Sequence, residues 1–417
     1  MAPSILFDKA GVLPSNSPSN KGLYSVYLIL FINFLLAIST TIGMTIIPFL
    51  ITESLGLSLL VVGLLEGSTE LFSNIFRLVN GVLFDKIKNR KIIFVGSTGL
   101  AMGSKLLLFL PTPWAVLFAK TLERIANGSF ASPRDAFVAE IAKNKGMALG
   151  LLSMSKTFGC VLGPLIVSMS TLFIGPLIDN LNLFVLICCA LVLPAFIGSF
   201  FLNSKGTQSE SFSLKEFGCV FKQTAPILFL VFLFFMGRFN DGLLMMYLKG
   251  KGLPEWFYLS AIAVFNATML ITSPFIGIAI DRGRLQRMLY ITIGALGLFN
   301  LCFYNLGLSL WPLSVLGLVA WGIQRAGAQI VFSALIFKSV HKMHYGTAIG
   351  IFYVTSGIGI MAASSLSGYL AKDHFSSVFV ISGTFSLLAL ACAGMVMNRQ
   401  ALLTPPTTSG LMPGATV

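Results

Sequence analysis

Long apolar runs alternate with short polar segments along the whole chain. A helix needs about 20 mostly apolar residues to cross a bilayer, and twelve of these runs are close to that length. They cover approximately 24–50, 58–83, 92–110, 114–139, 147–174, 181–202, 225–248, 257–280, 288–308, 311–338, 346–370 and 375–397. This pattern predicts an all-α integral membrane protein with twelve transmembrane helices.

The polar segments divide the chain and orient it. We expect an N-terminal segment 1–23, a six-helix half 24–202, a linker 203–224, a second six-helix half 225–397 and a tail 398–417. Lys and Arg concentrate in the loops on the side of the termini and the linker, whereas the other side carries only Lys249, Lys251 and Lys372. By the positive-inside rule, both termini and the linker are cytoplasmic.

Composition agrees with this reading and excludes several classes of protein. Hydrophobic residues make up 56% and charged residues 10% of the chain, whereas about 25% is usual for charged residues in soluble domains. The net charge of +13 lies mostly in short loops, so it predicts contact with the bilayer rather than with nucleic acid. The six cysteines have no metal or disulfide spacing and no phosphate-binding loop is present, so we expect no cofactor, no bound metal and no enzymatic activity.

One motif occurs twice. Gly81-Val-Leu-Phe-Asp85-Lys86 follows the second run, and Gly277-Ile-Ala-Ile-Asp281-Arg282 follows the eighth with the same spacing. Two six-helix halves in a parallel repeat, related by a pseudo-twofold axis, are typical of one large class of transporter. In that class the substrate site lies between the halves near the midplane of the bilayer.

These motifs resemble the Major Facilitator Superfamily over nearly the whole chain. The run from Gly81 to Lys91 resembles the family's loop signature between helices two and three, and Arg124 with Gly128 resembles its helix-four signature. The segment 133–136, Pro-Arg-Asp-Ala, resembles a prokaryotic subgroup. The resemblance implies a monomeric carrier of the inner membrane that works by alternating access.

The resemblance also implies gating roles. The implied residues are Gly81, Asp85, Lys86, Arg90, Lys91, Asp281 and Arg282 in the repeated loops, and Gly159, Gly163 and Pro164 in the helix-five signature associated with antiporters. The basic loops would form ion pairs that break as the halves rock. Two simpler interpretations stay open: the loops only fix topology, and the two glycines of helix five only permit close helix packing.

Charges inside the runs are the main candidates for a functional site, because they are costly in a bilayer. Glu66, Glu70 and Arg77 fall on one face of the second run, and Lys120 and Arg124 share a face of the fourth. Two carboxylates one turn apart repel each other, which favours uptake of a proton. The predicted proton-coupling residues are Glu66, Glu70, Arg124 and Asp241.

The remaining buried polar residues predict an anionic substrate. The runs hold eight basic and five acidic residues, and Lys156 and Arg325 stand where the resembling subgroup would lead us to expect acids. Guanidinium groups bind carboxylate or phosphate in a bidentate manner. The predicted substrate-binding residues are Lys120, Lys156, Arg238, Asn240, Gln324 and Arg325, although any of these charges is equally compatible with a structural ion pair.

Three functions follow from these features. The first is a secondary active antiporter that exports a small anionic molecule, such as a polycarboxylate, a siderophore-like compound or an organophosphate, in exchange for protons. The second is a proton-coupled importer of the same substrate class. The third is a membrane protein without transport activity that acts in assembly or sensing.

Overall fold

The computed structural model describes residues 20–87, 89–110, 112–141, 145–202, 214–305, 310–341, 345–372 and 374–403. Its elements are helical. In chain order they are α2 (Asn20–Phe49), η1 (Leu50–Ser54), α3 (Leu59–Lys86), α4 (Lys91–Leu107), α5 (Pro113–Ile141), α6 (Lys145–Phe173), η2 (Leu177–Asn180), α7 (Leu181–Ser199), α8 (Leu214–Met236), α9 (Asp241–Gly250), α10 (Glu255–Asp281), α11 (Leu285–Tyr304), α12 (Leu310–Ser339), α13 (Tyr345–Leu370) and α14 (Phe375–Leu403).

Helices occupy all twelve predicted ranges, with shifted ends. Within the described residues, ten segments are long and apolar enough to cross a membrane, and α8 and α9 together form one of them. The other two ranges hold α4, which is only 17 residues long, and α5, which carries charges along its length. Together these helices identify a multi-pass membrane protein.

Several helix limits differ from the sequence-based expectation, among them the start of α2 at Asn20, inside the expected N-terminal segment. Helix α8 begins at Leu214, inside the segment expected to be a linker, and α14 runs to Leu403, inside the expected tail. The seventh predicted helix is interrupted, since α8 ends at Met236 and α9 begins only at Asp241. Hydropathy alone missed the interruption, because the apolar residues on both sides keep the average over a membrane-length window high despite Arg238, Asn240 and Asp241.

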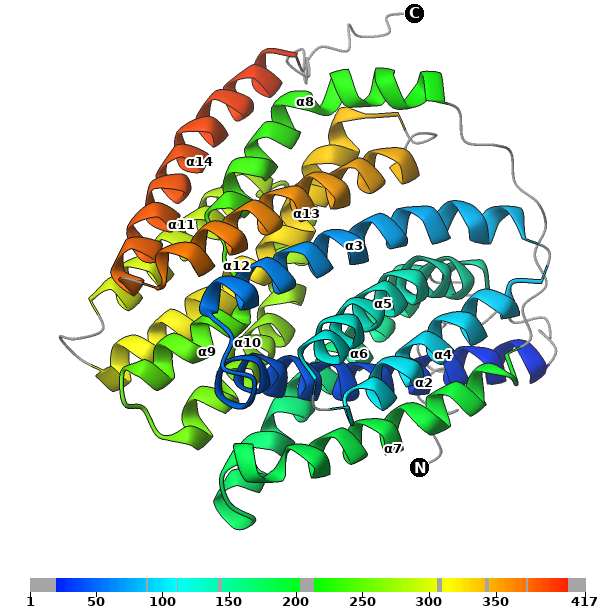
Figure 1. The fold of residues 1–417 in the computed structure, drawn as a ribbon. Helices are drawn as coiled ribbons and strands as arrows, with labels where there is room; N and C mark the ends of the chain where they lie inside the picture. The colour runs from blue at the N-terminus through cyan, green and yellow to red at the C-terminus, as the bar shows by residue number, and fades with distance from the viewer. Residues whose placement is uncertain are drawn as a thin grey trace, which may run out of the picture.

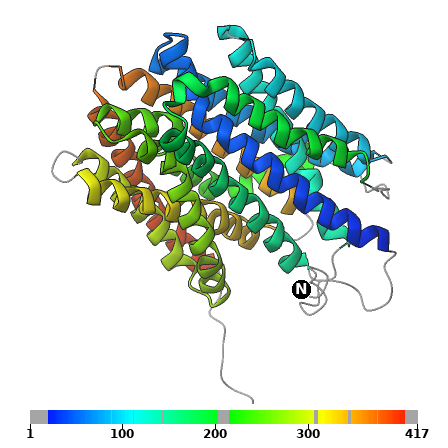
Figure 2. The same ribbon diagram turned by 90° about the horizontal axis from the view of Figure 1, so that it is seen from below.

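The helices pack in two groups. Helices α2, α4, α5, α6 and α7 pack with one another and with α3, and α8 to α14 pack among themselves. The groups meet along two long contacts, α3 with α13 and α6 with α10, and α3 lies beside α13 through the middle of the molecule (Figure 1). Figure 2 shows the same helices after a quarter turn, lying roughly side by side along a common direction.

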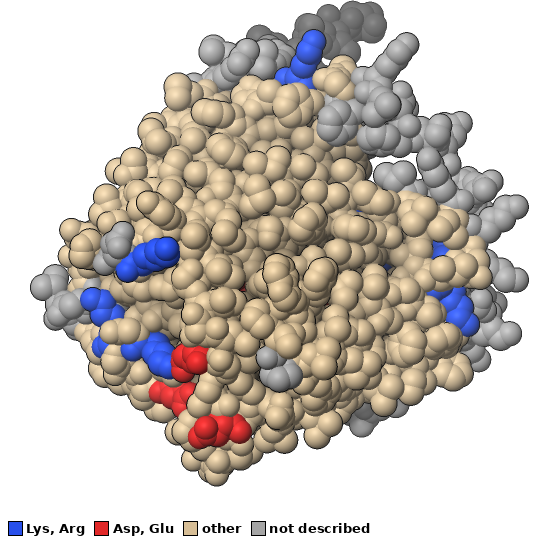
Figure 3. Space-filling model, viewed as in Figure 1, with Lys and Arg blue, Asp and Glu red and all other residues tan. Residues whose placement is uncertain are grey.

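Large apolar side chains cover much of the outside, among them Phe173, Phe275 and Leu387. In the view of Figure 3, charged side chains gather toward the margins and uncharged surface fills most of the face between them. Such a surface suits lipid contact, because hydrocarbon solvates apolar side chains and cannot solvate charges.

Candidate functional site

A cluster of four charged side chains lies between α3 and α5. The Lys120 ammonium is fully buried and lies 2.8 Å from a carboxylate oxygen of Glu66. Arg124 contacts both acids, with one nitrogen 3.5 Å from Glu66 and another donating to Glu70 at 3.1 Å. We call Glu66, Glu70, Lys120 and Arg124 the α3–α5 cluster; its two acids and two bases balance.

Close contact between the two helices positions this cluster. Gly128 of α5 lies against the backbone of Ser73 of α3, so that an added Cβ would collide with it. Gly81 of α3 likewise faces Ser132, whose hydroxyl would lie 2.7 Å from an added Cβ. Side chains one helical turn apart on α3 can therefore reach the same basic residue on α5.

A second cluster surrounds the interruption between α8 and α9. Asn240 caps α9, with its side-chain oxygen accepting a hydrogen bond from the backbone N–H of Leu243 at 2.8 Å. The next residue, Asp241, accepts hydrogen bonds from the Trp321 indole at 3.0 Å and from Arg325 at 2.5 Å. The start of α9 adds a favourable dipole for this carboxylate. We call Arg238, Asn240, Asp241, Gln324 and Arg325 the helix-break cluster.

Aromatic packing fixes the orientation of the indole. Trp321 is fully buried, and its ring lies 4.4 Å from the ring centre of Phe299 and 5.6 Å from that of Phe239. The guanidinium of Arg238 also lies against this aromatic group, 5.5 Å from the ring centre of Trp321 and 5.2 Å from that of Phe235.

The two clusters act on each other electrostatically. The Glu70 carboxylate interacts with the charges of Arg325 and Arg238 as well as with Arg124, and Arg124 interacts with Asp241. Glu70 and Arg325 keep 33% and 25% of their side-chain surface accessible, whereas Glu66 and Asp241 keep 8% and 9%. The accessible carboxylate of Glu70 and the enclosed carboxylate of Glu66 therefore lie on the same face of α3.

Three basic residues within the spans have no acidic partner among the described residues. Each of the five acids has a basic partner in the described structure: Lys120–Glu66, Arg124–Glu70, Lys105–Glu123, Arg134–Asp135 and Arg325–Asp241. Arg77, Lys156 and Arg238 have no carboxylate within salt-bridge distance among the described residues. Arg77 instead lies 4.4 Å above the ring of Tyr353, which belongs to the other group of helices.

Several buried polar atoms near these cations also lack partners. Both amide atoms of Gln324, the Asn240 side-chain nitrogen and the Arg238 Nε make no hydrogen bond with the described residues. Gln324 is fully buried. Because buried polar groups are normally satisfied, such atoms in a native protein call for an explanation, such as a water molecule, an ion or a ligand bound there.

Lys156 lies on a polar face of α6. Ser153 and Lys156 are both exposed, and Cys160 is half-buried one turn further on. The apolar residues Met154 and Phe158 are exposed on a different face of the same helix. Lys156 thus has an accessible side chain, and within the described part of the chain no ion pair joins it to either cluster.

The predicted gating residues have varied surroundings. Gly159 and Gly163 pack α6 tightly against α2, since added Cβ atoms would lie 2.8 Å from the carbonyl oxygen of Phe34 and 2.7 Å from that of Ile38. Pro164 continues the same helix. This close approach is the packing that the spacing of the two glycines predicts.

The loop residues are less directly placed. The side chains of Asp85 and Lys86 lie outside the described residues, while Lys91 is half-buried. Arg90 is buried and donates from Nε to the Phe84 carbonyl oxygen at 3.0 Å. Asp281 and Arg282 are exposed and form no ion pair within the described part of the chain.

Sequence patterns did not predict a third charged group, at the end of the molecule where η1, η2 and the α9–α10 turn meet. There Lys249 pairs with Glu53 at 2.5 Å across the two groups of helices. Glu255 accepts a hydrogen bond from the backbone N–H of Leu177 at 3.2 Å. A cavity of about 240 Å³ lies among these side chains, and Phe49 and Tyr258 form part of its wall. We call Glu53, Lys249 and Glu255 the η-end group; it joins the two groups of helices at that end.

Comparisons with known proteins agree with this architecture. Residues 29–261 and 256–411 match the family model of the Major Facilitator Superfamily. An uncharacterized MFS-type transporter of Methanocaldococcus jannaschii is 28% identical over 393 residues, which cover 90% of this chain and 96% of that protein. The inner membrane transport protein YajR of Escherichia coli is 21% identical over 380 residues, or 85% of this chain and 78% of YajR.

Solved structures share the fold at low sequence identity. A crystal structure of a POT family transporter in complex with a thioalcohol-conjugated peptide superposes with a TM-score of 0.76 at 12% identity, covering 91% of this chain and 96% of that one. The nucleoside transporter NupG superposes with a TM-score of 0.70 at 15% identity, covering 90% and 99%. The chain is a member of the Major Facilitator Superfamily, a secondary transporter and not an enzyme.

Proposed function

We propose that this protein carries a small anionic organic molecule together with protons by alternating access. In this proposal the twelve helical ranges all span the inner membrane, with cytoplasmic termini. The helix groups α2–α7 and α8–α14 rock as two repeated halves about the contacts of α3 with α13 and of α6 with α10. The POT transporter and NupG carry different cargoes on this fold, so the substrate class must be argued from side chains.

The proposal of an anionic substrate depends on one observation, the excess of cations within the spans. Arg77 and Arg238 have aromatic partners but no carboxylate among the described residues, and they come from different groups of helices. A substrate with one or more carboxylate or phosphate groups would neutralise them with charge-assisted hydrogen bonds. The unpartnered amide of Gln324 offers both a donor and an acceptor, which suits a hydroxyl group on the same molecule. Hydroxy-polycarboxylates, including siderophore-like compounds, and organophosphates have this chemistry.

The α3–α5 cluster supports proton coupling. Glu70 shares Arg124 with Glu66 and keeps a third of its side-chain surface accessible. Protonation of Glu70 would release Arg124 from one of its two acids and add a positive charge to the site. Asp241 would contribute in the same way through Arg325.

Charge also bears on the direction of transport. A proton that binds beside the anion site makes the site more positive, so it strengthens binding of an anion, and by linkage the anion strengthens binding of the proton. Mutual strengthening is what symport requires, and a proton gradient directed inward would then drive uptake. Import is thus the direction that the charges favour.

Antiport with export is the second candidate. The close packing of Gly159 and Gly163 against α2 is the feature that favours it, because the sequence around these glycines resembles the antiporter signature. Export of an anion in exchange for protons would require protonation to weaken anion binding. That is the opposite of what the electrostatic argument predicts for the α3–α5 cluster.

A gene deletion tests the proposal. Small anionic metabolites in the cells and in the medium are compared by mass spectrometry, and the compound that changes is then assayed in proteoliposomes with an imposed pH gradient. An anion that stays unused in the medium, and whose uptake is driven by an inward proton gradient, supports symport. A compound retained by the deletion strain supports export, and a neutral or cationic substrate contradicts the proposal.

A further inference from the structure

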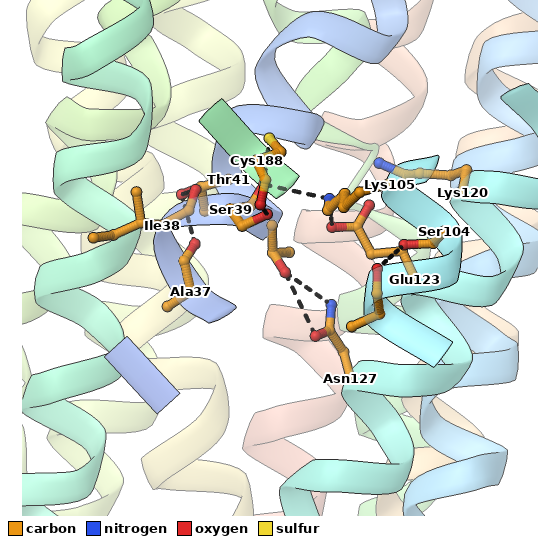
Figure 4. A network of polar contacts seen from close by, with 12 residues as sticks. Ala37, Ile38, Ser39, Thr41, Ser104, Lys105, Lys120, Glu123, Asn127 and Cys188 are labelled. Carbon is orange, nitrogen blue, oxygen red and sulfur yellow. Dashed lines mark hydrogen bonds and ion pairs between the residues drawn. The ribbon is translucent and has the colours of Figure 1, made fainter. Parts of the chain in front are cut away.

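One buried ion pair, Lys105 with Glu123, belongs to neither cluster. The Lys105 ammonium lies 2.5 Å from a carboxylate oxygen of Glu123, and their side chains are 1% and 3% accessible. Lys105 comes from α4 and Glu123 from α5, where it stands between Lys120 and Arg124 in the sequence. Figure 4 shows the pair in its network, with the nitrogen of Lys120 directed toward it.

Helices α2 and α7 close over this pair. Lys105 also donates to the carbonyl oxygen of Ser39 at 3.4 Å, and the thiol of Cys188 lies 3.5 Å from the same oxygen. A Cβ added to Gly43 would lie 3.1 Å from the Lys105 nitrogen and 3.4 Å from a Glu123 oxygen. The two charges are therefore enclosed by α2 and α7 and shielded from solvent.

If Lys105 did not neutralise it, Glu123 would compete with Glu66 and Glu70 for the bases of the α3–α5 cluster. Its carboxylate interacts electrostatically with both Lys120 and Arg124. Lys120 is three residues before it, a spacing at which helical side chains are neighbours. Without Lys105, Lys120 and Arg124 would be the cations left to neutralise a buried Glu123, and both are at present paired with Glu66.

We propose that Lys105 is a positioning residue for proton coupling: it holds Glu123 away from Lys120 and Arg124, so that these two cations stay with Glu66 and Glu70. This rests on the proposed function in one respect, namely that Glu66 and Glu70 take up the coupled proton. The groups that face Glu123 are Lys105 from α4, Lys120 and Arg124 from α5, Ser39 from α2 and Cys188 from α7. Those that act on Glu66 and Glu70 are Lys120, Arg124, Arg77, Arg238 and Arg325.

Infrared titration of the purified full-length protein tests this without a substrate. The C=O band of protonated carboxyl groups is followed against pH, and the part lost in Glu66→Gln and Glu70→Gln is assigned to those residues. If neither variant removes a titrating band, the proposed proton site itself fails. If a band is assigned, the effect of Lys105 can be judged separately.

The Lys105→Met variant then tests the role of Lys105. In this variant the Glu66 band is assigned again, as the part of the signal that is lost when Glu66→Gln is added. We expect the pH midpoint of that band to rise by about one unit, because Glu66 shares Lys120 with Glu123. In Lys105→Met/Glu123→Gln the midpoint returns to its wild-type value. A wild-type midpoint in Lys105→Met would overturn the proposal, as would a midpoint that stays raised in the double variant.

Gly43→Ala covers the case in which Lys105→Met does not fold. It keeps every charge, and the three atoms nearest to the added Cβ all belong to Lys105 and Glu123, so we expect a smaller rise of the same Glu66 midpoint. Gly103→Ala is the matched control on α4, since no atom lies within 4 Å of its added Cβ. Equal midpoints in Gly43→Ala and Gly103→Ala would contradict the proposal, and a rise confined to Gly43→Ala would support it.

Discussion

The α3–α5 cluster and the helix-break cluster use the same kinds of residue in different proportions. The first holds two acids and two bases on uninterrupted helices, and every charge has a partner. The second holds one acid and two guanidinium groups where α8 gives way to α9, and Arg238 has no acid among the described residues. In the proposed function this difference corresponds to two roles: the balanced cluster is the main site of proton exchange, and the unbalanced one binds the anion.

Removing an acid from the balanced cluster should have the largest effect. In Glu70→Gln, we expect transport driven by a pH gradient to fall by about 100-fold, the upper range of typical coupling between sites. Exchange of labelled for unlabelled anion without a gradient should persist, because no net proton movement is needed. Both rates are measured in proteoliposomes, with Asp179→Asn, an exposed acid of η2, as the control. Unchanged gradient-driven transport in Glu70→Gln would remove Glu70 from the proton pathway.

Removing the unpaired base from the second cluster should act on substrate binding. In Arg238→Gln, we expect the KM for the anion to rise by about 10- to 100-fold, since a charge-assisted hydrogen bond contributes about 1.5–3 kcal/mol. Driving by the pH gradient should survive at saturating substrate. Arg282→Gln, an exposed arginine after α10, is the control, and an equal rise of KM in both variants would show that Arg238 has no local role.

Gln324 separates a binding role from a packing role. Its buried amide has no partner in the described structure, so Gln324→Met should raise the free energy of unfolding by about 1 kcal/mol, because a buried unpaired polar group is removed. The same variant should raise the KM for the anion several-fold. Thermal unfolding and uptake are measured on one preparation. A variant that is less stable and has an unchanged KM would indicate that the amide serves packing alone.

The η-end pair should give the smallest effect. Glu53 and Lys249 are 33% and 41% accessible, and exposed pairs contribute at most about 1 kcal/mol. In Lys249→Gln we therefore expect a membrane-impermeant thiol reagent to label Thr52→Cys up to about fivefold faster. The charge-swapped Glu53→Lys/Lys249→Glu should label at the original rate. Equal labelling rates in the Thr52→Cys protein, in Lys249→Gln and in the charge-swapped variant would mean that the pair does not help to hold the two groups of helices together at this end.

Helical periodicity predicted the faces of the charged helices but not their partners. The spacing of Glu66, Glu70 and Arg77 places them on one face of α3, yet Glu66 and Glu70 bind bases of α5 whereas Arg77 lies over Tyr353 of α13. Spacing along one helix says which side chains lie together; it does not say which neighbour they meet. For that reason the sequence left open which charges are ion pairs and which are free to bind a ligand.

The interruption before α9 and the contact of Glu53 with Lys249 differ in how far the sequence alone could have predicted them. The interruption before α9 has a local signal, because Asn240 followed by an acid is typical of a helix start, but the apolar residues on both sides kept the window-averaged hydropathy high. The contact of Glu53 with Lys249 joins residues far apart in the chain. No spacing rule connects the two loops, so this contact follows only from how the two groups of helices pack.

The dependence of anion affinity on pH tests the central claim most directly. The Kd of the transported anion is measured on the purified protein across a pH range in which the anion itself does not titrate. Symport through these clusters predicts that the affinity rises as the pH falls, and that Glu70→Gln flattens the dependence. An affinity that falls on acidification would contradict the account and would indicate that protons and substrate compete.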